Sequence, residues 1–193
     1  MGQVEIVKLL LKDGVNPDSK SAYGRTPLLY AAEKGYETIL KLLLEKDEVD
    51  PDSKDPEYGR TSLSWAAANG HEDIVQLLLN ETRVDPNSRS KNGLSPITWA
   101  ARFGREKVVR LLLMKEMVNP DPKCNCGRTP LSYAAGRGHD VVVRMLLKNH
   151  GVDPGSQDFE YGRTPLSWAA LNGHKTIVDI LLKHKHYINL EAI

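Results

Sequence analysis

The sequence predicts an all-α solenoid, in which helix-turn-helix units of about 34 residues stack side by side. Three signals repeat with that period along the 193 residues. The motif Gly-Arg-Thr-Pro-Leu at 24–28 recurs, with some substitutions, at 59–63, 93–97, 127–131 and 162–166. A second glycine recurs at positions 2, 35, 70, 104, 138 and 173, and Val-Asp/Asn-Pro begins at 15, 49, 84, 118 and 152. Because the three signals keep one period, we predict five full repeats and an N-terminal half repeat.

Each repeat predicts two short helices and a turn-rich connector. Thr26 offers a hydroxyl cap, and Pro27 stands at the first helical position, where its missing N–H costs little. Leu28 and Ala31 then share one helical face, and Gly35 ends the helix. A leucine-rich second helix follows, and the Pro-containing connector breaks it. Both helices are apolar on more than one side, so only stacking between neighbouring units can bury them.

This order of motifs resembles the ankyrin repeat. The likeness rests on Gly-x-Thr-Pro-Leu, then Ala-Ala, then Gly-His and a leucine-rich second helix, and it covers essentially the whole chain. The variant Tyr-Gly-Arg-Thr-Pro-Leu-Ser-Trp-Ala-Ala at 161–170 resembles arrays that are abundant in filamentous fungi. Such arrays often accompany a nucleotide-binding module in large receptor-like or signalling proteins. The resemblance implies a non-catalytic module that binds a protein partner on its concave face.

The chain departs from the family pattern at one column of the first helix. The family's histidine after Thr-Pro-Leu is replaced by Leu29, Ser64, Thr98, Ser132 and Ser167. We expect the Ser and Thr hydroxyls to take over part of the hydrogen bonding that the imidazole makes to the threonine. The later Gly-His column is kept at His71, His139 and His174, whereas Arg105 replaces the histidine in the third repeat.

The repeats are expected to form a single domain over residues 1–193. The units are placed at 1–20 (a partial repeat), 21–55, 56–89, 90–123, 124–158 and 159–193. The 35-residue steps are expected to hold their extra residue in the connector. The partial repeat contains only a second helix and its connector, which leads us to expect that this chain is a slice of a longer array.

Composition and charge exclude several classes of protein. With 26 Lys+Arg against 25 Asp+Glu, the net charge of +1 argues against a nucleic-acid partner. Two cysteines do not make a secreted disulfide scaffold, and no apolar run approaches the roughly 18 residues of a membrane span. The N-terminus lacks the basic start of a signal peptide. We therefore expect a monomer in the reducing cytoplasm, without a membrane partner.

Several groups of residues could indicate other functions, but a structural explanation is simpler for each of them. The aromatic column could stack on bases or sugars, but a ring at one fixed position in every repeat favours contact between repeats. The histidines lie one per repeat, too far apart for a shared metal ion, and turn hydrogen bonding at the helix start is preferred. Cys124 and Cys126 lack zinc-site spacing and a nearby imidazole base, so exposed free thiols are expected. No cofactor, metal or catalytic residue is predicted. The aromatic column is Tyr30, Trp65, Trp99, Tyr133 and Trp168.

The connectors and the ends of the first helices are the candidate binding surface, because the resemblance places partners there. The recurring Tyr and Arg side chains of the connectors either bind a partner or brace adjacent connectors, and their repetition favours bracing. As braces, the arginines are expected to pair with acids such as Asp55, Glu57, Asp158 or Glu160. The recurring candidates are Tyr23, Arg25, Tyr58, Arg60, Arg128, Tyr161 and Arg163.

The central repeats depart from this recurring pattern. Leu94, Arg102, Phe103 and Arg137 combine an apolar residue, an exposed aromatic ring and two guanidinium groups, the residue types that anchor interfaces. Phe103 stands where a helix end is normally polar, so it either faces a partner or folds back onto a neighbouring repeat. The predicted function is rigid docking of a protein partner on these residues. The alternative is a structural or autoinhibitory spacer that packs on its own parent protein.

Overall fold

The computed structural model describes residues 2–191, with side chains from 3 to 184, and all regular secondary structure in that range is helical. The inner layer contains α2 (Pro27–Lys34), α4 (Ser62–Asn69), α6 (Pro96–Arg102), α8 (Pro130–Arg137) and α10 (Pro165–Leu171). The outer layer contains α1 (Gly2–Lys12), α3 (Glu37–Leu44), α5 (Glu72–Asn80), α7 (Glu106–Leu113), α9 (Asp140–Leu147) and α11 (Lys175–Glu191). This alternation confirms the predicted solenoid. The first and last predicted units reach Met1 and residues 192–193, which lie outside the described residues.

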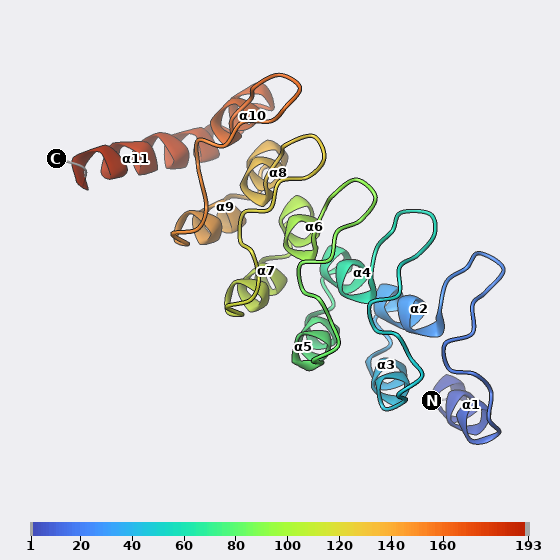
Figure 1. The fold of residues 1–193 in the computed structure, drawn as a ribbon. Coiled ribbons are helices and arrows are strands. Elements are labelled where there is room, and N and C mark those ends of the chain that lie inside the picture. The colour runs from blue at the N-terminus through green and yellow to red at the C-terminus, as the bar shows by residue number, and fades with distance from the viewer. Residues whose placement is uncertain (1, 192–193) are drawn as a thin grey trace.

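Five connectors project from the inner layer, on the side away from the outer helices (Figure 1). Each connector is closed by a backbone hydrogen bond of 2.9–3.1 Å, from the N–H of its first residue to the carbonyl of its last. We call these segments hairpins 1–5; they span residues 21–25, 55–60, 90–94, 124–128 and 158–163. Hairpins 2 and 5 are one residue longer, which confirms that the connector holds the extra residue of the 35-residue steps.

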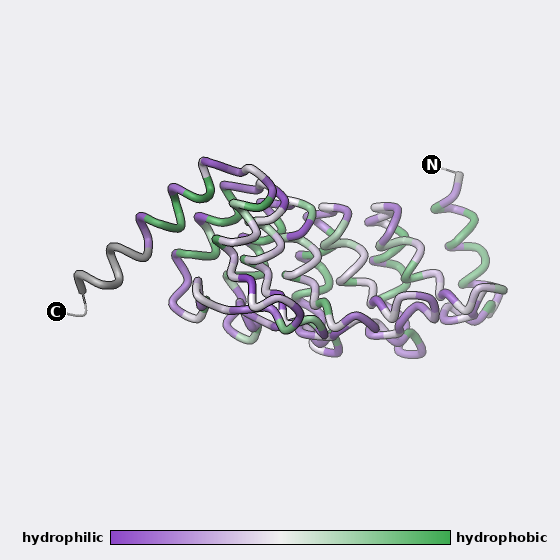
Figure 2. Tube along the Cα trace, turned by 90° about the horizontal axis from the view of Figure 1, so that it is seen from above, coloured by the Kyte–Doolittle hydropathy of each residue, from purple (hydrophilic) through white to green (hydrophobic). Residues whose placement is uncertain are grey.

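The core lies between the two layers and between successive repeats. Each inner helix packs against the next inner helix and against the outer helix that follows it in sequence. Ala66 and Ala67 of α4 are fully buried, as are Leu40 and Leu78 of the outer layer. The small alanine side chains let inner helices approach closely, so the apolar faces are removed from water. Figure 2 shows the result, with hydrophobic residues in the helices and hydrophilic residues along the connectors.

Threonine hydroxyls begin four of the inner helices. Thr61 accepts a hydrogen bond from the backbone N–H of Ser64 at 3.3 Å, and the Oγ atoms of the two residues lie 3.4 Å apart. In α8, the Oγ atoms of Thr129 and Ser132 are 3.3 Å apart. The serine hydroxyl therefore does take over part of the role of the family's histidine. The four capping residues are Thr26, Thr61, Thr129 and Thr164.

The histidines of the Gly-His column join neighbouring repeats. The ring of His71 makes no hydrogen bond to its own helix; its Nε2 lies 3.0 Å from the carbonyl oxygen of Glu33, at the end of α2. His139 lies in the same way 3.2 Å from the carbonyl of Arg102, and Arg105 donates from Nε to the carbonyl of Ala68 at 2.9 Å. The predicted helix-start bonding is therefore wrong for His71 and His139. These side chains bond to carbonyls at the C-terminal end of the preceding inner helix, which the helix itself leaves unpaired.

The first outer helix, α1, has no inner helix beside it among the described residues and packs mainly against α3. Its apolar side chains Ile6, Leu9 and Leu10 are consequently between 46% and 60% exposed. None of the described helices combines the length and the hydropathy that a membrane crossing requires.

Gly35 and Gly173 offer a matched test of contact between repeats. Gly35 ends α2 with φ +79°, and a Cβ there would lie 2.8 Å from the ring of His71. Gly173 has φ +74°, but a Cβ there would meet nothing within 4 Å. Gly173→Ala should therefore lower the free energy of unfolding by about 1 kcal/mol, the cost of left-handed backbone alone. Gly35→Ala should cost at least about 1 kcal/mol more, because the ring must give up its bond to Glu33. Urea denaturation measures both, and equal losses would contradict the role of His71.

Candidate functional site

The hairpins form a continuous row through backbone hydrogen bonds between neighbours. The N–H of Lys91 donates to the carbonyl of Tyr58 at 2.9 Å, and the N–H of Asn125 donates to the carbonyl of Asn92 at 3.1 Å. The N–H of Phe159 donates to the carbonyl of Cys126 at 2.9 Å. Three of the four junctions are therefore bonded in the same way. At the first junction the corresponding residue is Pro56, which has no N–H and instead packs its ring against Gly24.

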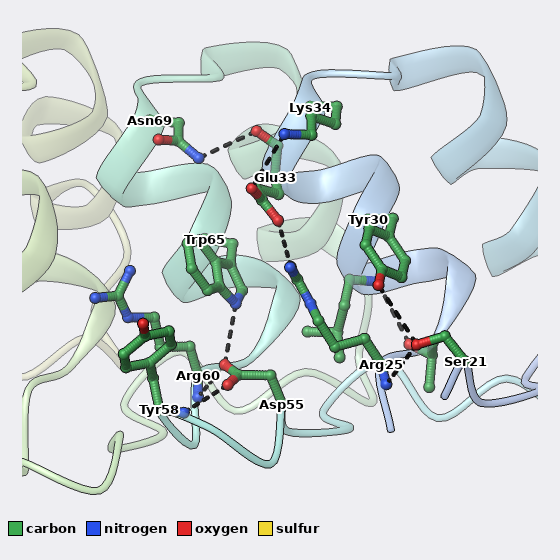
Figure 3. Close-up of polar contacts among 12 residues, drawn as sticks. Ser21, Arg25, Tyr30, Glu33, Lys34, Asp55, Tyr58, Arg60, Trp65 and Asn69 are labelled. Carbon is green, nitrogen blue, oxygen red and sulfur yellow. Dashed lines mark hydrogen bonds and ion pairs between the residues drawn. The ribbon is translucent and has the colours of Figure 1, made fainter. Parts of the chain in front are cut away.

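Behind the hairpins, arginine side chains lie between aromatic rings of successive repeats. The guanidinium carbon of Arg25 is 4.5 Å from the ring centre of Tyr30 in its own repeat and 4.9 Å from that of Trp65 in the next (Figure 3). Arg60 lies 4.4 Å from Trp65 and 3.6 Å from Trp99. The ring of Trp65 thereby contacts two guanidinium groups, one from each of two repeats, at distances where cation–π attraction operates.

Arg128 repeats the arrangement further along the stack. Its guanidinium carbon lies 4.2 Å from the ring of Tyr133 and 3.9 Å from that of Trp168 in the next repeat. Arg163 has rings of its own repeat only, Tyr161 at 4.3 Å and Trp168 at 5.0 Å. We call this series the arginine–aromatic ladder; it consists of Arg25, Arg60, Arg102, Arg128 and Arg163 with Tyr30, Trp65, Trp99, Tyr133 and Trp168.

The third repeat builds its part of the ladder differently. Leu94 stands where the other hairpins have arginine, and it is 3% exposed, in a buried cluster with Trp99 and Tyr133. Arg102 reaches the two rings from α6, at 5.5 Å from the centre of each. The expectation that Leu94 faces a partner is therefore wrong. An apolar side chain between two large rings is stabilised by burial there and leaves the cation to come from another element.

The predicted pairing of hairpin arginines with acids is also wrong for Arg60. Asp55 accepts hydrogen bonds from the backbone N–H of Tyr58 at 2.6 Å and of Arg60 at 2.9 Å. Its other contact is the indole N–H of Trp65, at 3.1 Å. Burial lowers the pKa of Arg60, and the rings on both sides accommodate the buried cation. Only Arg25 forms an ion pair within the described ladder, 2.5 Å from Glu33.

Asp158 in hairpin 5 repeats the contacts of Asp55. It accepts from the backbone N–H of Tyr161 at 2.8 Å and from the indole N–H of Trp168 at 2.9 Å. Burial raises the pKa of this carboxyl, but the hydrogen bonds from Tyr161 and Trp168 outweigh burial and hold the pKa below its usual value. Acid and indole together fix the hairpin to the inner helix that follows it.

Large side chains stand exposed along the outer edge of this framework. Tyr23 is 81% exposed, Tyr58 43% and Tyr161 61%. Phe103 stacks one face on Trp99, with ring centres 6.1 Å apart and planes 10° apart, and is still 40% exposed. Phe103 therefore packs on its own helix rather than on a neighbouring repeat, and part of its ring remains exposed to solvent. Arg137 at the end of α8 is exposed.

Sequence reasoning missed two further exposed apolar residues of this edge. Phe159 in hairpin 5 is 69% exposed, and Leu171 at the end of α10 is 61% exposed. Phe159 could have been found as an aromatic residue at the second hairpin position, where hairpins 2 to 4 carry Pro56, Lys91 and Asn125. Leu171 could have been found from its place at the end of an inner helix, close to that of Phe103. The prediction that both cysteines are exposed is wrong for Cys124, which is buried, and confirmed for Cys126. In the part of the chain that the structure describes, no group of three His, Cys, Asp or Glu side chains could hold a metal ion.

Comparison with family models decides the family. The model described as ankyrin repeats (3 copies) matches residues 1–55, 46–124, 63–158 and 113–192. The chain belongs to the ankyrin-repeat family. No curated protein matches it closely enough to count as a relative. Ankyrin repeats generally mediate binding between proteins and typically act without catalysis.

The ladder predicts unequal effects of two arginine substitutions in this ankyrin stack. Arg60→Gln should lower the free energy of unfolding by about 1–2 kcal/mol, because it removes a half-buried cation between Trp65 and Trp99. Arg163→Gln should cost less than about 1 kcal/mol, because no ring of a following repeat lies against it in the described stack. Urea denaturation followed by tryptophan fluorescence measures both. A cost for Arg163→Gln as large as that for Arg60→Gln would contradict the bridging role.

Removing the charge of Asp158 and that of Asp121 should change the stability of the fold in opposite directions. Asp158→Asn should destabilise the fold by about 1–3 kcal/mol at pH 7, because one amide oxygen cannot replace two carboxylate oxygens toward N–H donors. Asp158 has a lowered pKa, so its contribution is present above the unfolded pKa and is lost as pH falls through the folded pKa. The gap between parent and variant should therefore shrink between pH 7 and about pH 3.

The control is Asp121→Asn. Burial raises the pKa of Asp121 more than the hydrogen bond from the N–H of Asp153 lowers it, so its charge opposes folding at pH 7. Asn87 already fills the corresponding role, accepting from the N–H of Asn119 at 2.8 Å. Asp121→Asn should leave stability at pH 7 unchanged or raise it. A destabilisation equal to that of Asp158→Asn would contradict both assignments.

Proposed function

We propose that this ankyrin-repeat protein binds a protein partner, without catalysis, on the face formed by the hairpins and the C-terminal ends of the inner helices. In the family this face is the concave one. The contact residues, which we call the binding edge, are Tyr23, Tyr58, Phe103, Arg137, Phe159, Tyr161 and Leu171.

The observation that carries the proposal is the exposure of large aromatic side chains in hairpins 1, 2 and 5. Tyr23 and Tyr161, from the first and last hairpins, are 81% and 61% exposed, although tyrosine and phenylalanine are among the residues that gain most from burial. Aromatic and arginine side chains carry much of the binding energy of protein interfaces. A row of them along one edge therefore supports recognition of a protein rather than of a small molecule.

The ladder supplies the second support. Arg25, Arg60 and Arg128 are partly buried between rings, so we assign them to holding the edge in place rather than to contacting the partner. The hairpins are in addition bonded to one another through their backbones. A preformed edge loses little conformational entropy on docking, and more of the contact energy then remains as affinity.

Affinity measurements on three variants test the proposal. Cross-linked pull-down with the full chain from the source cell identifies the partner, and its affinity for purified variants is then compared. Phe103→Ala and Tyr23→Ala should each weaken binding by more than about 1 kcal/mol, roughly fivefold, because each removes an exposed ring from the binding edge. Val141→Ala is the matched control. The exposed fraction of Val141, 38%, is similar to the 40% of Phe103, but Val141 lies on the outer helix α9 and not on the binding edge.

The outcomes separate binding from packing. Equal affinity of Tyr23→Ala, Phe103→Ala and the parent would contradict the proposed edge. A stability loss confined to Phe103→Ala would reflect its stacking on Trp99, and Tyr23→Ala would still decide the question because that side chain is mostly in solvent. If the captured partner is another segment of the same polypeptide, the edge acts within its parent protein as a spacer or autoinhibitory contact.

A further inference from the structure

Hairpin 4 carries two thiols in a position where two other hairpins carry a carboxylate. Cys124 begins hairpin 4 as Asp55 and Asp158 begin hairpins 2 and 5, and its backbone N–H closes the hairpin on Arg128 in the same way. The Sγ atoms of Cys124 and Cys126 are 2.9 Å apart. Neither thiol is part of the binding edge.

The surroundings of Cys124 are those of a buried anion. The carboxylates of the other hairpins accept backbone N–H groups and the N–H of the tryptophan that follows. At Cys124 the same donors recur: the backbone N–H groups of Cys126 and Arg128 face its sulfur, and the Tyr133 hydroxyl lies 3.6 Å away. The Arg128 guanidinium stacks 4.2 Å from the Tyr133 ring and adds a nearby positive charge. The donors of the hairpin therefore stabilise a thiolate at Cys124.

The pKa values of the two thiols shift in opposite directions. Burial raises the pKa of Cys124, but hydrogen bonds from Cys126 and Tyr133 outweigh it and leave the pKa below its usual value. The pKa of Cys126 is raised by burial and by the charge on Cys124. When the pair loses its first proton, the negative charge is on Cys124, and the thiol of Cys126 donates to it.

Access from solvent is through Cys126. Cys124 is 3% exposed, whereas Cys126 is exposed and borders a cavity of about 140 Å³ beside hairpin 5. The charged and titratable groups that face this cavity are Arg128, Tyr133, Asp158 and Glu160, with Trp168 completing the wall. A small oxidant therefore reaches the sulfur of Cys126, whereas the sulfur of Cys124 is shielded from solvent.

We propose that Cys124 and Cys126 form a reversible disulfide, which makes hairpin 4 a two-electron redox site for hydrogen peroxide. Cys126 passes its proton to Cys124 and attacks a peroxide oxygen; the O–O bond breaks, a sulfenic acid forms on Cys126 and hydroxide leaves. Cys124, deprotonated again, attacks the Cys126 sulfur; the S–O bond breaks, the S–S bond forms and a second hydroxide leaves. The two thiol protons and the two hydroxides give two waters, so two thiols are oxidised as one peroxide is reduced.

Reversibility and a structural effect follow from the short separation of the two residues. A single residue lies between the cysteines, and a disulfide closed over so short a span is readily reduced by a dithiol. Oxidation also removes the thiolate acceptor from the hydroxyl of Tyr133, whose ring belongs to the arginine–aromatic ladder. The carbonyl of Cys126 bonds to Phe159, so the change lies in the row that joins hairpins 4 and 5.

Mass spectrometry of the full chain tests the site. The reduced protein is treated with hydrogen peroxide at pH 7, quenched with N-ethylmaleimide and weighed intact, before and after dithiothreitol. The expected product is two hydrogens lighter, takes no maleimide, and takes maleimide on both cysteines after reduction. A product that keeps two reactive thiols, one that carries added oxygen atoms, or a cross-linked dimer would overturn the proposal.

Rates distinguish the folded site from mere proximity in the sequence. Disulfide formation should be more than about threefold faster in the folded chain than in the chain unfolded in urea at the same pH. The fold holds the two sulfur atoms 2.9 Å apart and lowers the pH at which the pair loses its first proton. Tyr133→Phe removes a donor to Cys124 and should move the pH at which the rate rises upward. Tyr30→Phe is the matched control, since the hairpin before Tyr30 begins with Ser21, and should change nothing. Equal rates in folded and unfolded chains, or equal pH profiles for the two variants, would overturn the role of the hairpin.

Discussion

Each helix pair of this protein is apolar on two sides and can bury both only between two neighbouring pairs. The inner helices carry alanine at their contacts because bulkier side chains would hold successive repeats apart. Once the helices lie this close, polar groups must also find partners across the repeat boundary. His71 and Arg105 bond to carbonyls at the preceding inner helix, and hairpin N–H groups bond to the hairpin before.

The arginine–aromatic ladder links this stacking to the surface. Arg60 touches Trp65 in its own repeat and Trp99 in the next, so one side chain fixes the spacing and the angle of two repeats. The exposed rings of Tyr58 and Tyr161 lie against the guanidinium groups of Arg60 and Arg163. A binding edge supported in this way is positioned by the contacts between repeats as well as by the hydrogen bonds that close each hairpin.

The period of the sequence predicts the helices, their caps and the connector that holds the extra residue, because these depend on local residue types. Contacts across repeats are predicted less well. In the third repeat Leu94 stands at the hairpin position of the ladder arginine, and Arg102 of α6 supplies the guanidinium group instead. A comparison of equivalent positions cannot reveal this, because the guanidinium group comes from a different element. The partner of His71 lies 38 residues away, and the burial of Cys124 depends on the packing of the α8 ring Tyr133. Such features are set by neighbours in space rather than in sequence.

A double-mutant cycle between Arg60 and Trp99 tests the central claim most directly. The free energy of unfolding is measured for the parent, Arg60→Gln, Trp99→Leu and the double variant. If the ladder couples neighbouring repeats, the two single losses together exceed the loss of the double variant by about 1 kcal/mol or more. Losses that simply add would mean that Arg60 and Trp99 stabilise their repeats independently, and would contradict coupling of the repeats through the ladder.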